Sequence, residues 1–228
     1  MSILTHPRGV RSFVLRAGRM TEGQQRALDS LWPRFGLEYS PQRCDLDALF
    51  GRKAPRIVEI GFGNGDNLIQ MAQRRPEADF LGVEVHRPGV GRVLLEIERL
   101  GITNIRLSNH DAVEVVAEQL PEGSFEELLV LFPDPWHKKR HHKRRLLNAA
   151  FVALLATRLH SGGVLRAATD WEDYARQMLE VLRGCPQLEN LAPDDGYVPR
   201  PQSRQPTRFE RRGERLGHGV WDLAFRRR

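Results

Sequence analysis

The sequence predicts an α/β fold, a mostly parallel sheet with helices on both faces. Short β-branched and apolar runs alternate with stretches of helical period, and the connections between them are short and rich in Gly and Pro. The 228 residues contain no internal repeat, and this length suits one α/β domain with appendages. We therefore expect a basic, partly disordered N-terminal arm over residues 1–40 and a single domain over residues 41–228.

In the N-terminal half, strands and helices are delimited by local stop signals. Residues 88–100 carry apolar side chains at helical spacing, and Gly101 supplies the C-terminal stop. Pro76 ends the helix before it, since proline cannot continue a helix. The predicted elements are a short helix Thr21–Leu31, a strand Arg56–Ile60, a helix that ends at Arg75, a strand Phe80–Glu84, the helix over 88–100 and a strand Asn104–Ser108.

The C-terminal half continues the same alternation. Pro133 ends a strand that begins at Phe125, and Ser161-Gly-Gly163 ends a long helix. Residues 192–213 are rich in Pro and Arg, which predicts a loop. The predicted elements are a helix Ala112–Leu120, a strand Phe125–Phe132, a helix from about Lys143 to Leu159, a strand Val164–Thr169, a helix from Trp171 to about Arg183 and a last strand Val220–Phe225 at an edge.

Charge and cysteine content bound the partners and the compartment. Lys and Arg outnumber Asp and Glu by 35 to 29, which favours polyanions as partners, with membrane surfaces second. Two isolated cysteines, Cys44 and Cys185, fit a reducing compartment and exclude a disulfide framework. No stretch approaches the ~20 apolar residues of a membrane span, and the first twenty residues lack the apolar core of a secretory signal. We expect a cytoplasmic protein without a membrane segment.

The loop after the first strand predicts a nucleotide-type cofactor. Gly61, Gly63 and Gly65 allow positive φ angles and close backbone approach to a ligand. Their spacing is not that of a dinucleotide fingerprint, and Glu59 directly before them disfavours a pyrophosphate. A carboxylate suits a cation, and S-adenosyl-L-methionine carries a sulfonium and an ammonium group. The loop therefore favours S-adenosyl-L-methionine over NAD.

Carboxylates follow successive predicted strands. They are Glu84, Asp111, Asp134 and Asp170. Asp111 or Asp170 alone is as readily a helix N-cap, but four acids at the carboxyl ends of a parallel sheet favour a ligand cleft. Glu84, about twenty residues after the glycine loop, suits the two ribose hydroxyls, and Asp111 suits the adenosine.

The loop after the fourth strand predicts the substrate side. Prolines on both sides of Asp134 stiffen the loop, and Trp136 offers a flat face for a base. The basic run that follows, residues 137–145, is on its own a typical solvated helix face. Beside the predicted catalytic end of the sheet, it favours phosphate contact. Its histidines lack the acidic or Cys partners of a metal site, so we expect no metal.

With these residues in place, the chain resembles the bacterial tRNA (guanine-N7)-methyltransferase family, and the resemblance covers most of its length. The segments that carry the resemblance are Arg11–Thr21, Val58–Gly65, Gly82–His86, Phe132–Arg140, Ala168–Asp170 and Thr207–Gly213. The phrase Pro-Asp-Pro-Trp-x-Lys with Thr-x-Phe-Glu downstream is highly specific. The resemblance implies a Rossmann-like class I methyltransferase fold, with a mostly parallel seven-stranded sheet and an antiparallel edge strand.

The resemblance also implies an activity: transfer of a methyl group from S-adenosyl-L-methionine to N7 of guanosine 46 in the tRNA variable loop, leaving S-adenosyl-L-homocysteine. Asp134 is then catalytic, and the cofactor is bound by Glu59, Gly61, Gly63, Gly65, Glu84, Asp111 and Asp134. Substrate is bound by Lys138, Asp170, Thr207, Arg208, Phe209 and Glu210. The RNA contacts are Arg140, His141, His142, Lys143, Arg144 and Arg145. The partner is tRNA, with no obligate protein partner evident, and the enzyme is a monomer or a homodimer.

Guanine N7 has an in-plane lone pair and no proton, so its methylation needs no general base. The main task is to hold the reacting atoms in line, and a fixed carboxylate near the base stabilises the positive charge that develops there. We assign this role to Asp134, aided by Asp170 and Glu210. Which of the three carboxylates binds the N1–H and amino edge of guanine stays open.

Three other functions compete with this one. The first is a methyltransferase that acts on another RNA base or on a protein. The second is an NAD-type oxidoreductase, which the glycine spacing and Glu59 disfavour. The third is an RNA-binding module with a vestigial cleft, which the full set of strand-end carboxylates disfavours.

Overall fold

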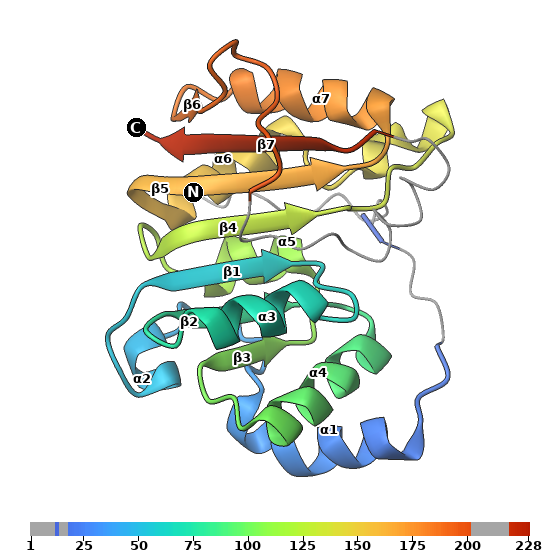
Figure 1. The fold of residues 1–228 in the computed structure, drawn as a ribbon, viewed down its shortest axis with the longest axis vertical. Coiled ribbons are helices and arrows are strands. Elements are labelled where there is room, and N and C mark those ends of the chain that lie inside the picture. Colours follow the sequence, from blue (N-terminus) through green and yellow to red (C-terminus); the bar gives the residue numbers. More distant parts are fainter. Residues whose placement is uncertain (1–11, 14–17, 202–218) are drawn as a thin grey trace.

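The computed structural model describes residues 12–13, 18–201 and 219–228. Within them the strands form one seven-stranded sheet in the order β3-β2-β1-β4-β5-β7-β6 (Figure 1). The strands are β1 (Arg56–Ile60), β2 (Asp79–Val83), β3 (Ile105–Ser108), β4 (Phe125–Leu131), β5 (Leu159–Thr169), β6 (Leu188–Asn190) and β7 (Trp221–Arg227). Strands β1 to β5 pair in parallel and β7 runs antiparallel to its neighbours. The predicted fold class is confirmed.

Helices cover both faces of the sheet. They are α1 (Glu22–Phe35), α2 (Leu46–Phe50), α3 (Asp66–Arg74), α4 (Arg87–Leu100), α5 (Ala112–Glu114) with a π-helical turn Val115–Gln119, a 3₁₀ segment Lys139–Arg144, α6 (Ala149–Arg158) and α7 (Glu172–Arg183). Alternate strand residues divide the core into two apolar clusters. Ile57 packs with α1, α3 and α4, whereas Val58 packs with α6 and α7 on the other face. None of the helices in the described residues is long and apolar enough to cross a membrane.

The helix predicted over 21–31 is confirmed and continues to Phe35. Thr21 caps it: the Thr21 hydroxyl accepts from the Gln24 amide at 3.2 Å, and the Gln24 side chain accepts from the Thr21 amide at 2.8 Å. Such a capping box fixes the start of a helix by pairing two orphan donors. The helix packs against α4, whose end at Gly101, with φ 64°, is also as predicted.

The predicted long helix from Lys143 to Leu159 is wrong in its first turns. The basic residues form the 3₁₀ segment instead, and α6 begins only after Asn148, whose side chain accepts from the Phe151 amide at 3.1 Å. The break lies at Arg145 and Asn148, whose extended backbones have ψ angles of 128° and 168°, and Asn148 then starts α6 as its N-cap.

The strand predicted to begin at Val164 begins at Leu159. The Ser-Gly-Gly sequence, expected to end a helix, lies within β5, where the pairing with β4 shifts register and Gly162 has φ 85°. The last predicted strand, β7, lies one position in from the edge. The three-residue strand β6, which the sequence analysis did not predict, pairs with its outer side.

Candidate functional site

The glycine loop and Glu84 form one hydrogen-bonded unit at the carboxyl ends of β1 and β2. All three glycines have positive φ angles, between 57° and 77°. The Glu84 carboxylate accepts from the backbone amides of Gly63 at 2.8 Å, Val85 at 2.7 Å and His86 at 2.9 Å. A carboxylate has about four acceptor positions, so Glu84 keeps one for a ligand while it holds the loop in shape.

A cavity of about 200 Å³ opens beside this unit. Gly61 and Glu84 border it on one side, and Phe132 and Asp134 border it on the other. The walls between are apolar, formed by Ile60, Val83, Val85, Ala112, Leu131 and Leu146. Polar groups at the rim and apolar walls between them are typical of sites for small ligands with charged or polar ends.

The structure places Glu59 and Asp111 outside the lining of this cavity. Glu59 is buried, with its side chain accepting from the Asn67 amide nitrogen at 3.0 Å behind the glycine loop. Asp111 is the N-cap of α5, and its carboxylate accepts from the Val113 amide at 2.9 Å. For Asp111 the structural role left open by the sequence is therefore real, and a ligand would have to share the carboxylate.

An aromatic pair that we did not predict from the sequence lies at the Glu84 end of the cavity. The ring of Tyr39, which follows α1, stacks on His110 with the centroids 3.8 Å apart, and His110 lines the cavity. His110 also pairs with Glu114. Burial, together with a hydrogen bond to Glu118, raises the pKa of Tyr39 to about 12. No local pattern in the sequence connects His110 with a tyrosine 71 residues earlier.

The loop after β4 has an unusual backbone. Phe132 and Trp136, neither of them glycine, have φ angles of 51° and 47°, and the exposed Asp134 lies midway between them. Such conformations each cost about 1–3 kcal/mol and persist only where the surroundings fix them. The loop is therefore held in a strained shape that presents Asp134 to the cavity.

Trp136 is already in contact with protein groups. Its indole donates to the Ser12 carbonyl at 3.1 Å, the Arg144 guanidinium lies 4.8 Å from its ring centroid, and His141 approaches it edge-on. The free flat face expected from the sequence is thus largely used.

Most of the basic run is at the surface. Lys138, Arg140 and Lys143 are exposed, while His141, His142 and Arg144 are half-buried. Burial and the charges of the surrounding Arg and Lys side chains hold the pKa of His141 below its usual 6.5. Asp170 is half-buried directly after β5.

Arg145 requires a correction. We expected it to contact RNA, but its side chain is only 2% exposed and bonds to protein groups. We no longer count it among the residues presented to RNA.

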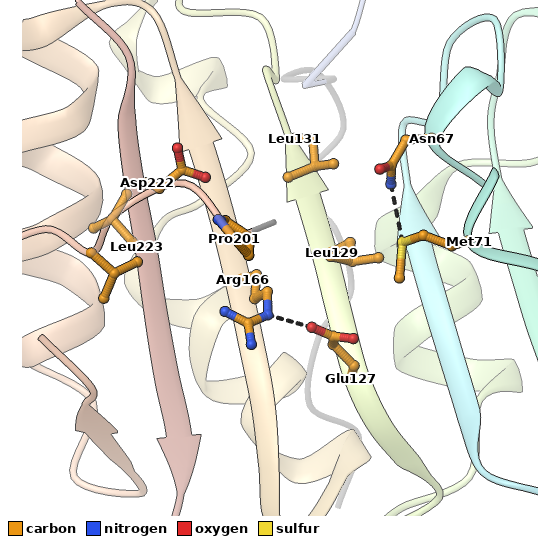
Figure 2. A pocket seen from close by; sticks show the side chains of 10 residues that line it. Asn67, Met71, Glu127, Leu129, Leu131, Arg166, Pro201, Asp222 and Leu223 are labelled. Atoms are coloured by element: carbon orange, nitrogen blue, oxygen red, sulfur yellow. Dashed lines mark hydrogen bonds and ion pairs between the residues drawn. The ribbon is translucent and has the colours of Figure 1, made fainter. Parts of the chain in front are cut away.

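A second, smaller hollow lies over β4, β5 and β7 on the face that α3 covers in part (Figure 2). The Arg166–Glu127 ion pair crosses its floor, and Asn67 and Met71 border it. Its volume of about 10 Å³ accommodates no more than a water molecule.

Thr207, Arg208, Phe209 and Glu210, predicted to bind substrate, lie outside the described residues. Within those residues, no group of three or more His, Cys, Asp or Glu could hold a metal ion.

Comparison with known proteins identifies the family. A family model described as "Putative methyltransferase" matches residues 53–223. Three curated relatives carry the name tRNA (guanine-N(7)-)-methyltransferase. The protein of Methylococcus capsulatus is 58% identical, covering 97% of this chain and 95% of its own. That of Ralstonia nicotianae is 59% identical, covering 98% and 88%, and that of Pseudomonas aeruginosa 56%, covering 96% and 90%.

Solved structures share the fold at low identity. The 16S rRNA methyltransferase KamB superposes with a TM-score of 0.58 at 13% identity, over 82% of this chain and 95% of that one. A 16S rRNA (adenine(1408)-N(1))-methyltransferase from Catenulisporales acidiphilia, solved with its cosubstrate SAM, gives 0.54 at 17% identity, over 81% and 92%. The sheet and its helices are therefore those of class I methyltransferases.

Proposed function

The chain belongs to the tRNA (guanine-N7)-methyltransferase family, and from that premise we propose that it methylates N7 of guanosine 46 in the variable loop of tRNA, with S-adenosyl-L-methionine as donor. One observation carries the proposal: the cavity has the glycine loop and Glu84 at one side and the strained Asp134 loop at the other. The cofactor half and the substrate half of a methyl-transfer site thus face each other across one small space. We place the reaction in the cytoplasm, where bacterial tRNA is found.

The residues present fit the donor. Glu84 has an acceptor position left for ribose hydroxyls, and Gly61 brings backbone close to the cavity without a side chain. The apolar walls suit the uncharged middle of the molecule, and the buried Glu59 carboxyl, which accepts from Asn67, is assigned to its cationic groups. Asp111 adds an acceptor near the adenosine end. Cofactor binding is thus assigned to Glu59, the three glycines, Glu84, Asp111 and Asp134.

The bound donor supplies a methyl carbon on a sulfonium; the N7 lone pair forms the new bond, and the electrons of the C–S bond stay on sulfur. No proton moves, so the protein needs no general base. Asp134 has two tasks: it orients the guanine, and its charge stabilises the positive charge that grows on the purine. Asp170, which follows the neighbouring strand β5, and Glu210 assist.

The basic side chains beside this loop bind the RNA backbone. Lys138 and the Thr207–Glu210 segment contact the target nucleotide. Arg140, His141, His142, Lys143 and Arg144 neutralise phosphates, a contact that positions RNA without reading its sequence. Arg145 is excluded because it is buried.

A labelled methyl-transfer assay tests the proposal. The protein is mixed with labelled S-adenosyl-L-methionine and unmodified tRNA, and the modified nucleoside is then identified. We expect 7-methylguanosine at position 46, and no label in a matched transcript with adenosine at that position. Label in 7-methylguanosine elsewhere would refute the position; label in another base or in protein would refute the substrate. Cofactor binding without any transfer would support an RNA-binding module with a vestigial cleft, and nicotinamide binding would support an oxidoreductase.

A further inference from the structure

Arg145 differs from the other cations of the basic run by its burial. Its neighbours Lys143 and Arg144 are exposed and half-buried, whereas Arg145 is 2% exposed. An unpaired guanidinium at this depth would be costly, so its partners define its role.

Every nitrogen of the guanidinium has a partner. Nε donates to the Pro135 carbonyl at 2.9 Å, one terminal nitrogen donates to Gln177 at 2.5 Å, and the other donates to Asp173 at 2.6 Å. The group also lies 4.7 Å from the ring centroid of Tyr174. Three of these four partners belong to α7, and the fourth is the carbonyl of the residue directly after Asp134. Arg145 thus links the Asp134 loop to a helix that packs on the sheet.

This link acts where the loop most needs support. Trp136, the next residue after Pro135, is held at φ 47°, and Phe132 at φ 51°. The backbone anchor before Asp134 is the Phe132 amide, which donates to the Ala168 carbonyl of β5 at 2.8 Å. The anchor after Asp134 is the bond from Arg145 to Pro135. Its loss would remove the hydrogen bond that holds the backbone directly after Asp134.

We propose that Arg145 is a positioning residue: it holds the Asp134 loop in its reactive shape by joining Pro135 to α7. The inference rests on the proposed function for its catalytic consequence, but the mechanical link exists whatever the substrate. The hydrogen bond from Arg145 also keeps the pKa of Asp173 below its ordinary value.

The test compares Arg145→Gln with Lys143→Gln, an exposed neighbour in the same run. For Arg145→Gln we expect kcat to fall about 10- to 100-fold, because misplacing a catalytic group by about 1 Å can cost 10²-fold. The KM for tRNA and the salt dependence of tRNA binding should stay unchanged. For Lys143→Gln, a proposed phosphate contact, we expect instead a salt slope lower by about 1 and a higher KM for tRNA. Lys53→Gln, at a lysine whose side chain is 90% exposed and lies outside the cavity and the basic run, is the control in which kcat and the salt slope stay as in wild type. Arg145→Lys should restore kcat only in part, since one ammonium cannot make three separated contacts.

Two further measurements keep the test valid if Arg145→Gln folds poorly. Asp173→Asn alters the same link from its exposed end, with the Asp173 side chain 61% exposed, and should lower kcat in the same direction by less. Amide hydrogen exchange should speed up over residues 132–138 in both variants, while exchange over the glycine loop stays as in wild type.

Hydrogen exchange needs no activity, so it separates the two proposals. If wild type transfers no methyl group to tRNA but the exchange result holds, the function is wrong and the link is right. A reduced salt slope with kcat intact in Arg145→Gln would make Arg145 a phosphate contact. Lower stability with kcat and loop exchange unchanged would make it a purely structural residue. Either result would overturn the proposal.

Discussion

The two sides of the cavity are built in different ways. On the cofactor side, the backbone amides of Gly63, Val85 and His86 converge on one carboxylate, Glu84, at the end of the neighbouring strand. On the substrate side, a strained loop is held by a buried guanidinium whose partners lie on α7, 28 and 32 residues further along the chain. The cofactor side is therefore held by bonds from the backbone to the single carboxylate of Glu84. The substrate side depends on side chains from segments that are distant in the sequence.

Because the two sides are built differently, substitutions on them should have different effects. Glycines and a strand-end acid recur wherever this fold binds a nucleotide, because the requirement is a tight turn and close approach. The substrate side instead keeps an exposed carboxylate and a dense set of cations beside a loop under backbone strain. We therefore expect substitutions on the substrate side to change turnover and those on the cofactor side to change affinity and folding.

The largest effect is expected from Asp134→Asn. Removing one fixed charge from a developing transition state costs about 10²–10³-fold in turnover. The tRNA dissociation constant should change little, since the backbone contacts remain. Single-turnover kinetics and filter binding measure the two quantities, and Glu98→Gln, an exposed acid on α4, serves as the control. Equal losses of turnover and tRNA binding would remove the catalytic role.

Glu84→Gln tests the other side of the cavity. The amide offers one acceptor oxygen where three backbone N–H groups now bond, and each unpaired buried donor costs about 1–3 kcal/mol. We expect binding of S-adenosyl-L-homocysteine, measured by calorimetry, to weaken by about 10- to 100-fold. Binding of tRNA alone should be unchanged. Unaltered cofactor affinity would show that the loop does not depend on this carboxylate.

The same contrast explains what the sequence could predict. The glycine loop and Glu84 could be predicted as parts of a cofactor site because the strand, the turn and the acid lie close together in the chain. The prediction of one long helix over 143–159 was wrong because the backbone becomes extended at Arg145 and Asn148, and Asn148 starts a new helix as an N-cap. The burial of Arg145 gave no signal, since an arginine in a basic run has the pattern of a solvated one. Its contacts with Asp173, Tyr174 and Gln177 on α7 distinguish it, and no local period encodes them.

A matched pair of glycine substitutions examines the packing of the cofactor side. Gly61 and Gly65 have similar φ angles of 73° and 77°, so alanine at either position strains the backbone by about 1–2 kcal/mol. A Cβ at Gly61 meets no atom within 4 Å, whereas one at Gly65 would lie 2.1 Å from a methyl group of Val93. Urea denaturation should show Gly65→Ala to be less stable than Gly61→Ala by about a further 1–3 kcal/mol. Equal losses of unfolding free energy in the two variants would mean that Val93 and α4 move aside without destabilising the protein.

The smallest expected effect is the pH dependence of tRNA binding through His141. Its pKa lies below 6.5 in the free protein because of burial and the cations Arg140, Arg144, Lys138 and Lys143. Phosphates that approach this cluster favour the imidazolium, so the pKa rises in the complex and binding takes up a proton. Affinity should therefore increase as pH falls from 7 through the free-protein pKa, and the salt slope should grow by less than about 1.

Binding isotherms at several pH values, for wild type and His141→Gln, measure the difference, and the subtraction removes the contribution of the other histidines. An identical pH profile for the two proteins would show that His141 stays neutral on the bound surface. The phosphate contacts of the substrate side would then be made by arginine and lysine alone.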